Sequence, residues 1–321
     1  MKKILFIPIL IFLILVIFIL NINPVFNKKQ MEIGDYIQFG KYNNEPILWR
    51  VINIDDNGNV LLLSDRIICF KAFDSKGTYH SDEFRLFLGS NYWKDSNIRQ
   101  WLNSNNNKYH IKWIQNSPSK ENVLSGLLPY ENEKGFLADG NFNKSERNVI
   151  KSVMHKFILH DTDIQEITKG EKNLRVTLRG DLKEAVAEYD SVYYENTEDK
   201  VFLLSLKELY EYVYKNRSLL GEDYIIAKPT KESIKQIINE LPEKPFGLNT
   251  ESGWDSFLRS PSSSTPSFVR VVKDDGSIGD GVANSAGHGG IRPALTLDSL
   301  SIYLKGAGTK SNPFIVKVKN K

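Results

Sequence analysis

The chain opens with an uninterrupted apolar run, residues 4–20, that contains no charged or hydrogen-bonding side chain. At about 1.5 Å per residue, a helix of this length spans roughly 26 Å, close to the thickness of a bilayer core. Pro8 lies in its second turn, and membrane helices tolerate such a residue. The run therefore predicts one transmembrane helix over residues 4–20, with the lipid bilayer as its partner.

A cleaved signal peptide is the alternative interpretation of this run. Its apolar region normally has about 7–15 residues and is followed by small residues at the cleavage site. Here residues 21–26 follow, the first alanine is Ala72, and Cys69 lies too far along for lipoprotein processing. An uncleaved signal anchor is favoured.

The flanking charges give little help with orientation, because Lys2 and Lys3 on one side are matched by Lys28 and Lys29 on the other. A three-residue tail usually stays inside. We therefore expect a single-pass protein of the cell membrane with its C-terminal domain outside. The expected parts are a cytoplasmic tail (1–3), the transmembrane helix (4–20), a juxtamembrane linker (21–32), an extracytoplasmic domain (33–298) and a C-terminal hairpin (299–321).

Composition excludes several classes of function. The formal charge of the 321-residue chain is +3, of which Lys2 and Lys3 supply two. The remainder lacks the basic field that binding to a phosphate backbone needs, so nucleic acid is not expected as a partner. Cys69 is the single cysteine, which excludes an internal disulfide and a cysteine-based zinc site.

Short elements of both kinds follow the apolar run. Apolar patterning predicts strands near residues 35–40, 47–52, 60–63, 201–204, 268–272 and 291–297, with a final hairpin of 301–304 and 314–318. Helices are predicted over residues 96–102 with Ser96 as N-cap, from Asn143 or Ser145 onward, over 206–214 with Ser205 as N-cap, and over 231–241. Residues 160–200 are polar and are interpreted as an insertion with a hairpin. The absence of βαβ alternation favours the α+β class.

The loop of residues 53–59 is similar to the first half of a calcium loop, with Asn53, Asp55, Asn57 and Gly58 at matching positions. The twelfth position should be a bidentate Glu but is Ser64. Since Asn57-Gly58 is also a strong hairpin signal, a plain turn is favoured over a metal loop.

The usual catalytic motifs are absent from the sequence, including nucleophile elbows, phosphate-binding loops and His-Glu-x-x-His zinc helices. His155 and His160, with Asp161 and Asp163, form a polar cluster that could take a metal, although a solvated loop is the favoured interpretation. We therefore predict no catalytic residue, no metal ligand and no cofactor.

Two stretches in the C-terminal third stand out, residues 254–261 and 290–295, because each places an Arg beside apolar residues and a Pro. A buried guanidinium must find acceptors. In one interpretation the two arginines hold loops to carbonyls or carboxylates. In the other they line a binding surface, since Trp and Arg are common anchors on loops. The candidate ligand-binding residues are Trp254, Asp255, Arg259, His288 and Arg292.

These stretches carry a family resemblance. In order along the chain, the shared signals are Ile37-x-Phe39-Gly40, Pro46-Ile47-x-Trp49-Arg50-Val51, Leu61-Leu62-Leu63-Ser64, Ser96-x-Ile98-Arg99-x-Trp101-Leu102-Asn103, Val201-Phe202-Leu203-Leu204-Ser205, Leu258-Arg259-Ser260-Pro261 and Gly290-Ile291-Arg292-Pro293-Ala294-Leu295. Together they resemble the bacterial family known as domain of unknown function 6273, over about residues 33–298. The chain departs from the pattern W-W-L-R-S-P-G, because Asp255-Ser256-Phe257 separates Trp254 from Leu258 and Ser262 replaces the glycine.

The resemblance implies a C-type-lectin-like fold with a loop-rich final third, related to folds that bind sugars or proteins. A related branch that generates formylglycine relies on paired cysteines, so its activity is not expected in a chain with Cys69 alone. The leading hypothesis is a membrane-anchored extracytoplasmic binding module for a cell-surface glycan or protein. The alternatives are an enzyme acting on wall polymers and a structural subunit of a membrane complex.

Overall fold

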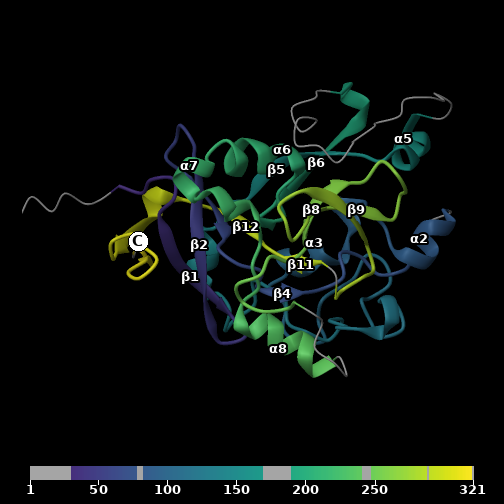
Figure 1. Ribbon diagram of the computed structural model, residues 1–321, viewed down its shortest axis with the longest axis horizontal. Coiled ribbons are helices and arrows are strands. Elements are labelled where there is room, and N and C mark those ends of the chain that lie inside the picture. Colours follow the sequence, from purple (N-terminus) through teal and green to yellow (C-terminus); the bar gives the residue numbers. More distant parts are fainter. Residues whose placement is uncertain (1–29, 78–81, 169–188, 241–246, 288, 320–321) are drawn as a thin grey trace, which may run out of the picture. The chain divides into compact units, whose positions relative to one another are not determined.

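The computed structural model describes residues 30–77, 82–168, 189–240, 247–287 and 289–319 (Figure 1). The chain divides into two compact units, Met1–Met31 and Glu32–Lys321. The three β-sheets all lie in the second unit, and they bring together strands that are far apart in the sequence.

The largest sheet has seven strands in the order β13-β14-β1-β2-β3-β12-β7. Their bounds are β1 Tyr36–Tyr42, β2 Glu45–Ile54, β3 Val60–Ser64, β7 Val201–Phe202, β12 Ala294–Leu297, β13 Ile302–Lys305 and β14 Phe314–Val318. Strands β1, β2 and β3 form an antiparallel meander, and β14 runs parallel to β1 with Ile37 opposite Phe314. The turn between β1 and β2 is tight because Asn43 and Asn44 both adopt positive φ, which asparagine tolerates.

The second sheet has five strands in the order β10-β9-β8-β11-β4, and the third pairs β5 with β6. Their bounds are β4 Cys69–Phe70, β5 Val153–Ile158, β6 Tyr194–Asp199, β8 Ser256–Pro261, β9 Phe268–Val272, β10 Ile278–Val282 and β11 Gly290–Ile291. All six residues of β8 are buried, although three of them are Ser256, Arg259 and Ser260. Their polar groups must therefore be satisfied inside the protein.

The helices are short. The α-helices are α2 Glu83–Leu88, α3 Asn97–Asn103, α4 Lys144–Val149, α5 Asp161–Thr168, α6 Leu206–Glu208, α7 Arg217–Leu220 and α8 Lys231–Glu240. A π-helical stretch, η5 (Leu209–Tyr214), continues α6, and single 3-10 turns are η1 Trp93–Asp95, η2 Leu124–Gly126, η4 Ser191–Tyr193, η6 Glu222–Ile225 and η7 Ser299–Ser301. The predicted N-caps Ser96 and Ser205 are confirmed, since each side chain accepts a hydrogen bond from the third backbone N–H of its helix.

The predicted fold class, an α+β, C-type-lectin-like domain preceded by a transmembrane helix, is wrong. Sheets dominate the described residues, and α8, the longest helix among them, has 10 residues. Within the same ranges, no helix combines the length and apolar character needed to cross a bilayer. The physical reason is that the sequence shows where short helices begin but does not show how strands far apart along the chain assemble into sheets. The predicted span, residues 4–20, and residues 169–188 of the predicted 160–200 insertion lie outside the described residues.

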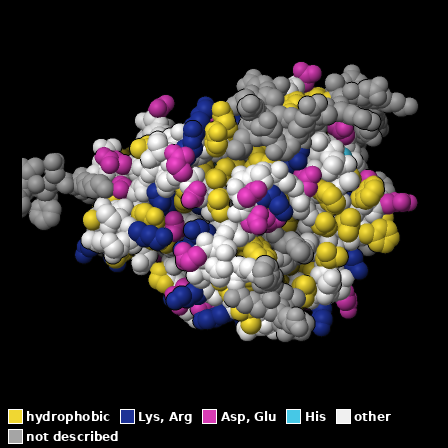
Figure 2. All heavy atoms as spheres, viewed as in Figure 1, with side chains coloured by type: hydrophobic (Ala, Val, Ile, Leu, Met, Phe, Trp, Pro, Cys, Tyr) yellow, Lys and Arg dark blue, Asp and Glu magenta, His cyan; other side chains and the backbone are white. Residues whose placement is uncertain are grey.

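The core contains three fully buried tryptophans whose indole N–H groups each find a partner. The indole of Trp49 on β2 donates to the carbonyl of Phe39, and that of Trp101 on α3 donates to the carbonyl of Lys134. Trp93 donates to the carboxylate of Asp199 at 3.0 Å. The surface, by contrast, carries a cluster of hydrophobic side chains near α2 (Figure 2), where Phe84 and Phe87 are exposed.

Candidate functional site

The candidate site is a pocket of about 300 Å³ beside the turn that joins β1 to β2 in the large sheet. Four segments far apart in the sequence line it: the end of β1 with the start of β2, the link from β3 to β4, the start of α8 and the loop from β13 to β14. Its twelve residues are Tyr42, Glu45, Pro46, Ile47, Leu48, Asp65, Arg66, Ile68, Thr230, Lys231, Glu232 and Lys310. A volume of this size is at the lower end of those that hold small ligands.

The middle of the pocket is apolar. Ile47 on β2 and Ile68, in the link just before β4, are both buried. Tyr42 is also buried, and its hydroxyl donates to Glu133 at 3.3 Å. Burial and the Glu133 carboxylate raise the pKa of Tyr42 well above its ordinary value, so the phenol stays protonated.

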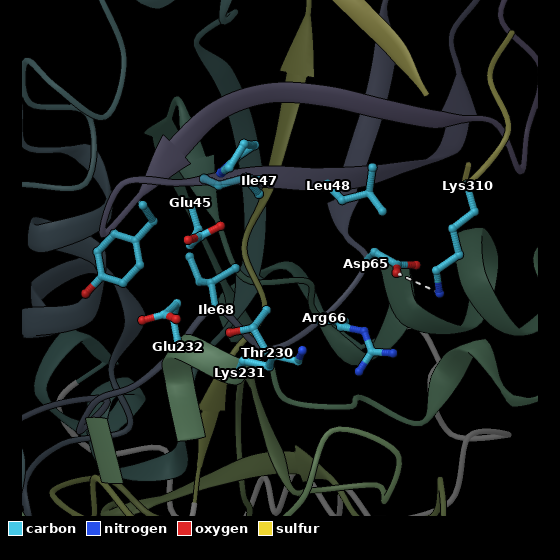
Figure 3. Close-up of a pocket in the computed structure, with 12 residues that line it drawn as sticks. Glu45, Ile47, Leu48, Asp65, Arg66, Ile68, Thr230, Lys231, Glu232 and Lys310 are labelled. Atoms are coloured by element: carbon cyan, nitrogen blue, oxygen red, sulfur yellow. Dashed lines mark ion pairs between the residues drawn. The ribbon is translucent and has the colours of Figure 1, made fainter. Parts of the chain in front are cut away.

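Charged side chains occupy the two ends of the pocket (Figure 3). Glu45 and Glu232 lie toward one end of the view, while Arg66 and Lys310 lie toward the other with Asp65. In this view Ile68 lies between the two glutamates, and Thr230 and Lys231 lie on the side toward Arg66. The pocket thus has two glutamates toward one end, of which Glu232 is paired with Lys235, and Arg66 and Lys310 toward the other.

Arg66 is held in place by the backbone around it. Its Nη1 donates to the carbonyls of Pro229 and Thr250, and its Nη2 lies 3.6 Å from the carboxylate of Glu251. The guanidinium is therefore fixed, and a ligand anion that meets it need not order a flexible side chain.

Lys310 is less restrained. Its Nζ is 3.7 Å from the Asp65 carboxylate, and its side chain is 58% exposed. An ion pair with one partner this exposed contributes little to stability, so the ammonium is available to a competing anion at small cost.

The sequence-predicted residues lie elsewhere. Arg259 is buried on β8, where it pairs with Glu208 and donates to the carbonyl of Leu203 at 2.6 Å. Arg292 is also buried and donates to the carbonyls of Ser64 and Tyr224 at 2.9 and 3.0 Å. Both adopt the first arrangement considered from the sequence, in which guanidiniums hold loops to carbonyls or carboxylates.

Trp254 and Asp255 are half-buried and also bind within the protein. The Trp254 ring packs edge-on against Phe70 at 6.3 Å, beside a core cluster that includes Ile67. The Asp255 carboxylate accepts from Lys273 Nζ at 2.5 Å and from the backbone N–H of Asp274. His288 lies outside the described residues. None of the four described candidates lines the pocket.

The polar cluster predicted from His155, His160 and their neighbours is divided. His155 faces Glu208, with 3.4 Å between Nδ1 and the carboxylate. His160 accepts from the backbone of Thr162, beside the Arg85–Asp163 ion pair. Burial and the Arg85 charge lower the pKa of His160. In the part of the chain that the structure describes, no three His, Cys, Asp or Glu side chains are placed to share a metal ion.

The residues that line the pocket were not predicted from the sequence to form a site. Glu45, Arg66, Glu232 and Lys310 are ordinary surface-type residues in four separate segments. The one usable signal is that Asp65 and Arg66 directly follow the buried strand β3, at the point where a strand delivers side chains to a sheet edge.

The described residues form a strand-dominated protein with a pocket lined by charged and apolar side chains beside the β1–β2 turn. Residues 57–299 match the family model described as Domain of unknown function (DUF6273), and the chain belongs to this family. The resemblance seen in the sequence is thus confirmed at the level of the family. No curated protein and no solved structure matches the chain.

Proposed function

We propose that the protein is a binding module whose ligand is a short peptide with a free amino and a free carboxyl end. The observation that carries this proposal is the separation of charge along the pocket, with Glu45 and Glu232 toward one end and Arg66 and Lys310 toward the other. A ligand with one charge of each sign matches both ends at once.

Each end of the pocket has the chemistry to bind one end of such a peptide. A ligand ammonium would bind the Glu45 carboxylate, with Glu232 beside it in an exposed ion pair with Lys235, and Arg binds planar carboxylates through two parallel hydrogen bonds. The apolar middle, formed by Ile47 and Ile68, accommodates a small aliphatic side chain. Hydrogen bonds to charged groups contribute about 1.5–3 kcal/mol each, so the two ends dominate the affinity.

The pocket's own hydroxyl groups favour binding over catalysis. Thr230 Oγ1 accepts from the backbone N–H of Ser233 at 3.1 Å and so caps α8. Tyr42 is kept protonated by its raised pKa. Neither hydroxyl is activated as a nucleophile. An enzyme acting on wall polymers and a location outside the membrane remain predictions from the sequence.

The test is titration of the full-length chain with trialanine, followed by calorimetry and by NMR shifts of pocket amides. Trialanine should bind, whereas N-acetyl-trialanine and trialanine amide, each lacking one charge, should bind about tenfold more weakly, a difference of about 1.4 kcal/mol. Equal affinity for all three peptides, or no shift of pocket amides at millimolar trialanine, overturns the proposal. Binding of a neutral sugar in this pocket in place of the peptides also overturns it.

Two exposed residues allow each end to be tested without disturbing the core. Lys310→Gln should weaken trialanine but leave trialanine amide unchanged, and Glu45→Gln should weaken trialanine but leave the N-acetylated peptide unchanged. Lys215→Gln is the matched control, since Lys215 is an exposed lysine that pairs with Glu211 away from the pocket. If Lys215→Gln weakens trialanine as much as Lys310→Gln, the effect is one of net charge and the assignment of Lys310 is wrong.

A further inference from the structure

A second pocket, of about 470 Å³, lies on another part of the fold. It is bordered by the turn between β2 and β3, the start of β5, strand β12 and the π-helical stretch η5. Its lining residues are Asn53, Asp55, Asn57, Asn59, Leu61, Lys151, Ser152, Val153, Met154, His155, Phe202, Glu208, Tyr212 and Thr296. It shares no residue with the first pocket, which is proposed above to bind a peptide and is called the peptide pocket below.

His155 is the distinctive group in this pocket. It is 6% exposed, its ring packs on Phe202 with 3.9 Å between centroids, and its Nδ1 lies 3.4 Å from Glu208. Arg259 and the backbone N–H of Ser205 fix the Glu208 carboxylate in turn. Burial alone would raise the pKa of Glu208, but Arg259 and His155 hold it well below its ordinary value. Glu208 is therefore an anion that accepts from Nδ1–H.

The other ring nitrogen has no such partner. Nε2 of His155 is buried and meets no hydrogen-bonding group among the described residues. With Nδ1–H facing Glu208, Nε2 accepts a hydrogen bond in one protonation state of the ring and donates one in the other, and a ligand hydroxyl matches both. Leaving a buried polar atom unsatisfied costs about 1–3 kcal/mol, which a ligand hydroxyl would recover.

The β2–β3 turn forms a polar part of the lining that is held by its own hydrogen bonds. Asp55 accepts from the backbone N–H groups of Asn57 and Asn59 at 3.0 and 2.7 Å, and also from the side chain of Asn59. These hydrogen bonds lower the pKa of Asp55. The loop is thus the hairpin turn favoured from the sequence, and the Asp55 carboxylate is used within that turn. Asn53 and Asn57 line the pocket.

Tyr212 adds a further hydrogen-bond donor to the lining. It lies in η5, where the backbone N–H of Lys215 bonds to the carbonyl of Tyr210 in the wider π-helical pattern. Short π-helical stretches are uncommon and occur frequently at functional sites. Burial and the charges of Glu208 and Glu211 raise the pKa of Tyr212, so its hydroxyl remains a donor.

The lining as a whole is rich in uncharged groups that both donate and accept: three Asn amides and the hydroxyls of Ser152, Thr296 and Tyr212. The apolar contribution comes from Val153, Met154 and Phe202. Alternating donors and acceptors beside an apolar wall match a molecule whose hydroxyls project from a carbon ring. Asp55 and Lys151 have opposite charges, and the charge of Glu208 is offset by Arg259, which lies outside the lining. The lining therefore has little net charge to select for an ion.

From this geometry we infer that the pocket is a second binding site, for a neutral polyhydroxylated ligand the size of one or two sugar units. One ligand hydroxyl forms a hydrogen bond with Nε2 of His155, the side-chain amides of the β2–β3 turn bind further hydroxyls, and Tyr212 donates to a ring or hydroxyl oxygen. The site does not depend on the peptide pocket.

The first experiment is titration of the full-length chain with glucose, galactose and N-acetylglucosamine, followed by NMR of the imidazole nitrogens. Binding of at least one sugar should shift the Nε2 resonance of His155 and the backbone amides near Asn57 and Thr296. No shift with any of the three sugars, up to tens of millimolar, overturns the inference. A shift confined to pocket residues around Lys310 also overturns it.

A matched pair of variants tests the hydrogen bond itself. An Asn side chain reaches about as far as Nδ1, whereas a Gln side chain reaches about as far as Nε2. His155→Gln should therefore keep sugar affinity within about threefold, while His155→Asn should lose about tenfold or more, as expected for one hydrogen bond of about 1.4 kcal/mol. His110→Gln, at an exposed histidine outside the pocket, is the control.

If both variants at position 155 lose sugar binding equally while their melting temperatures match the parent, His155 contributes shape alone and the proposed hydrogen bond is wrong. Lys310→Gln distinguishes sugar binding in this pocket from peptide binding in the first pocket. It should leave sugar affinity unchanged, so failure of either proposal is recognised independently of the other.

Discussion

The guanidinium of Arg259 on β8 is paired through both terminal nitrogens with the carboxylate of Glu208 at the end of α6. Nη2 donates to Oε1 at 2.8 Å, and Nη1 donates to Oε2. The same carboxylate accepts from the backbone N–H of Ser205, which closes the capping box of α6. One carboxylate thus caps a helix, binds a buried guanidinium and orients His155, so three elements depend on it.

This pairing predicts a large loss of stability when either partner is removed. Glu208→Gln leaves the Arg259 guanidinium buried without a counter-charge, and Arg259→Met does the same to the carboxylate. Breaking one side of a buried pair costs about 3–5 kcal/mol. Urea unfolding of each variant measures the loss. Glu211→Gln, at the exposed Lys215 pair, serves as the control and should cost under about 1 kcal/mol.

The double variant Glu208→Gln/Arg259→Met distinguishes a charge pair from simple packing. Because neither charge then remains buried, it should recover part of the loss of the single variants. If the single changes cost no more than the exposed control, the pair does not hold β8 to α6.

Local signals in the sequence located elements accurately but not the fold class. Ser96 and Ser205 cap their helices as predicted, and strand β9 has the predicted bounds. Strand β8 is not among the predicted strands, because Ser256, Arg259 and Ser260 interrupt its apolar pattern. Its burial depends on partners such as Glu208 and the backbone N–H of Leu206, which bonds to Ser260, and no local window contains them.

The candidate sites show the same limit more strongly. The sequence singled out Arg259 and Arg292 because arginine beside proline and apolar residues is unusual, and that signal marked buried structural contacts. The peptide pocket combines Glu45 with Arg66, Glu232 and Lys310 only because β2, the β3–β4 link, α8 and the last loop meet in space. Such a meeting depends on the order of strands in the sheet, which periodicity does not reveal.

Asp74 predicts an unusual dependence of stability on pH. It is fully buried, and burial raises the pKa of its carboxyl to about 7, although the backbone N–H groups of Ser90 and Asn97 donate to it. Between about pH 4 and pH 7 the folded protein holds a proton at this site and the unfolded chain does not. Its contribution to the free energy of unfolding therefore falls as pH rises, by up to about 1.4 kcal/mol per pH unit, and levels off above pH 7.

The check is urea unfolding of the parent and of Asp74→Asn at pH 5 and pH 8. The amide does not titrate, so subtracting the variant's change from that of the parent isolates Asp74. We expect the parent to lose more stability than the variant on going to pH 8. A parallel change in the two proteins would mean that Asp74 is ionised throughout this range in the folded state.

Cys69 should be unreactive in the folded protein. The thiol on β4 is fully buried, and burial raises its pKa to about 12, with only partial opposition from the Lys71 charge. Because the thiolate is the reactive form, a disulfide reagent should modify the native chain many times more slowly than the urea-unfolded chain. The Cys69→Ser variant supplies the background rate. Rapid modification without urea would show that β4 opens readily at its edge.

Trp254 is expected to stabilise the fold through its contact with Phe70. Its ring packs edge-on against that of Phe70, with 6.3 Å between the ring centroids, beside a cluster of buried side chains. Its backbone N–H donates to the carbonyl of Ala227. Since the ring is partly exposed, Trp254→Ala should cost about 2–3 kcal/mol, near the lower end for aromatic truncations. Trp254→Phe keeps an aromatic ring and removes an indole N–H that is buried without a partner, so it should cost less. Urea unfolding of both variants, with trialanine and sugar titrations alongside, decides between core and surface. If Trp254→Ala keeps full stability but abolishes binding of trialanine or of the sugar, Trp254 belongs to a binding surface. That result would support the alternative drawn from the sequence, in which this stretch lines a ligand site.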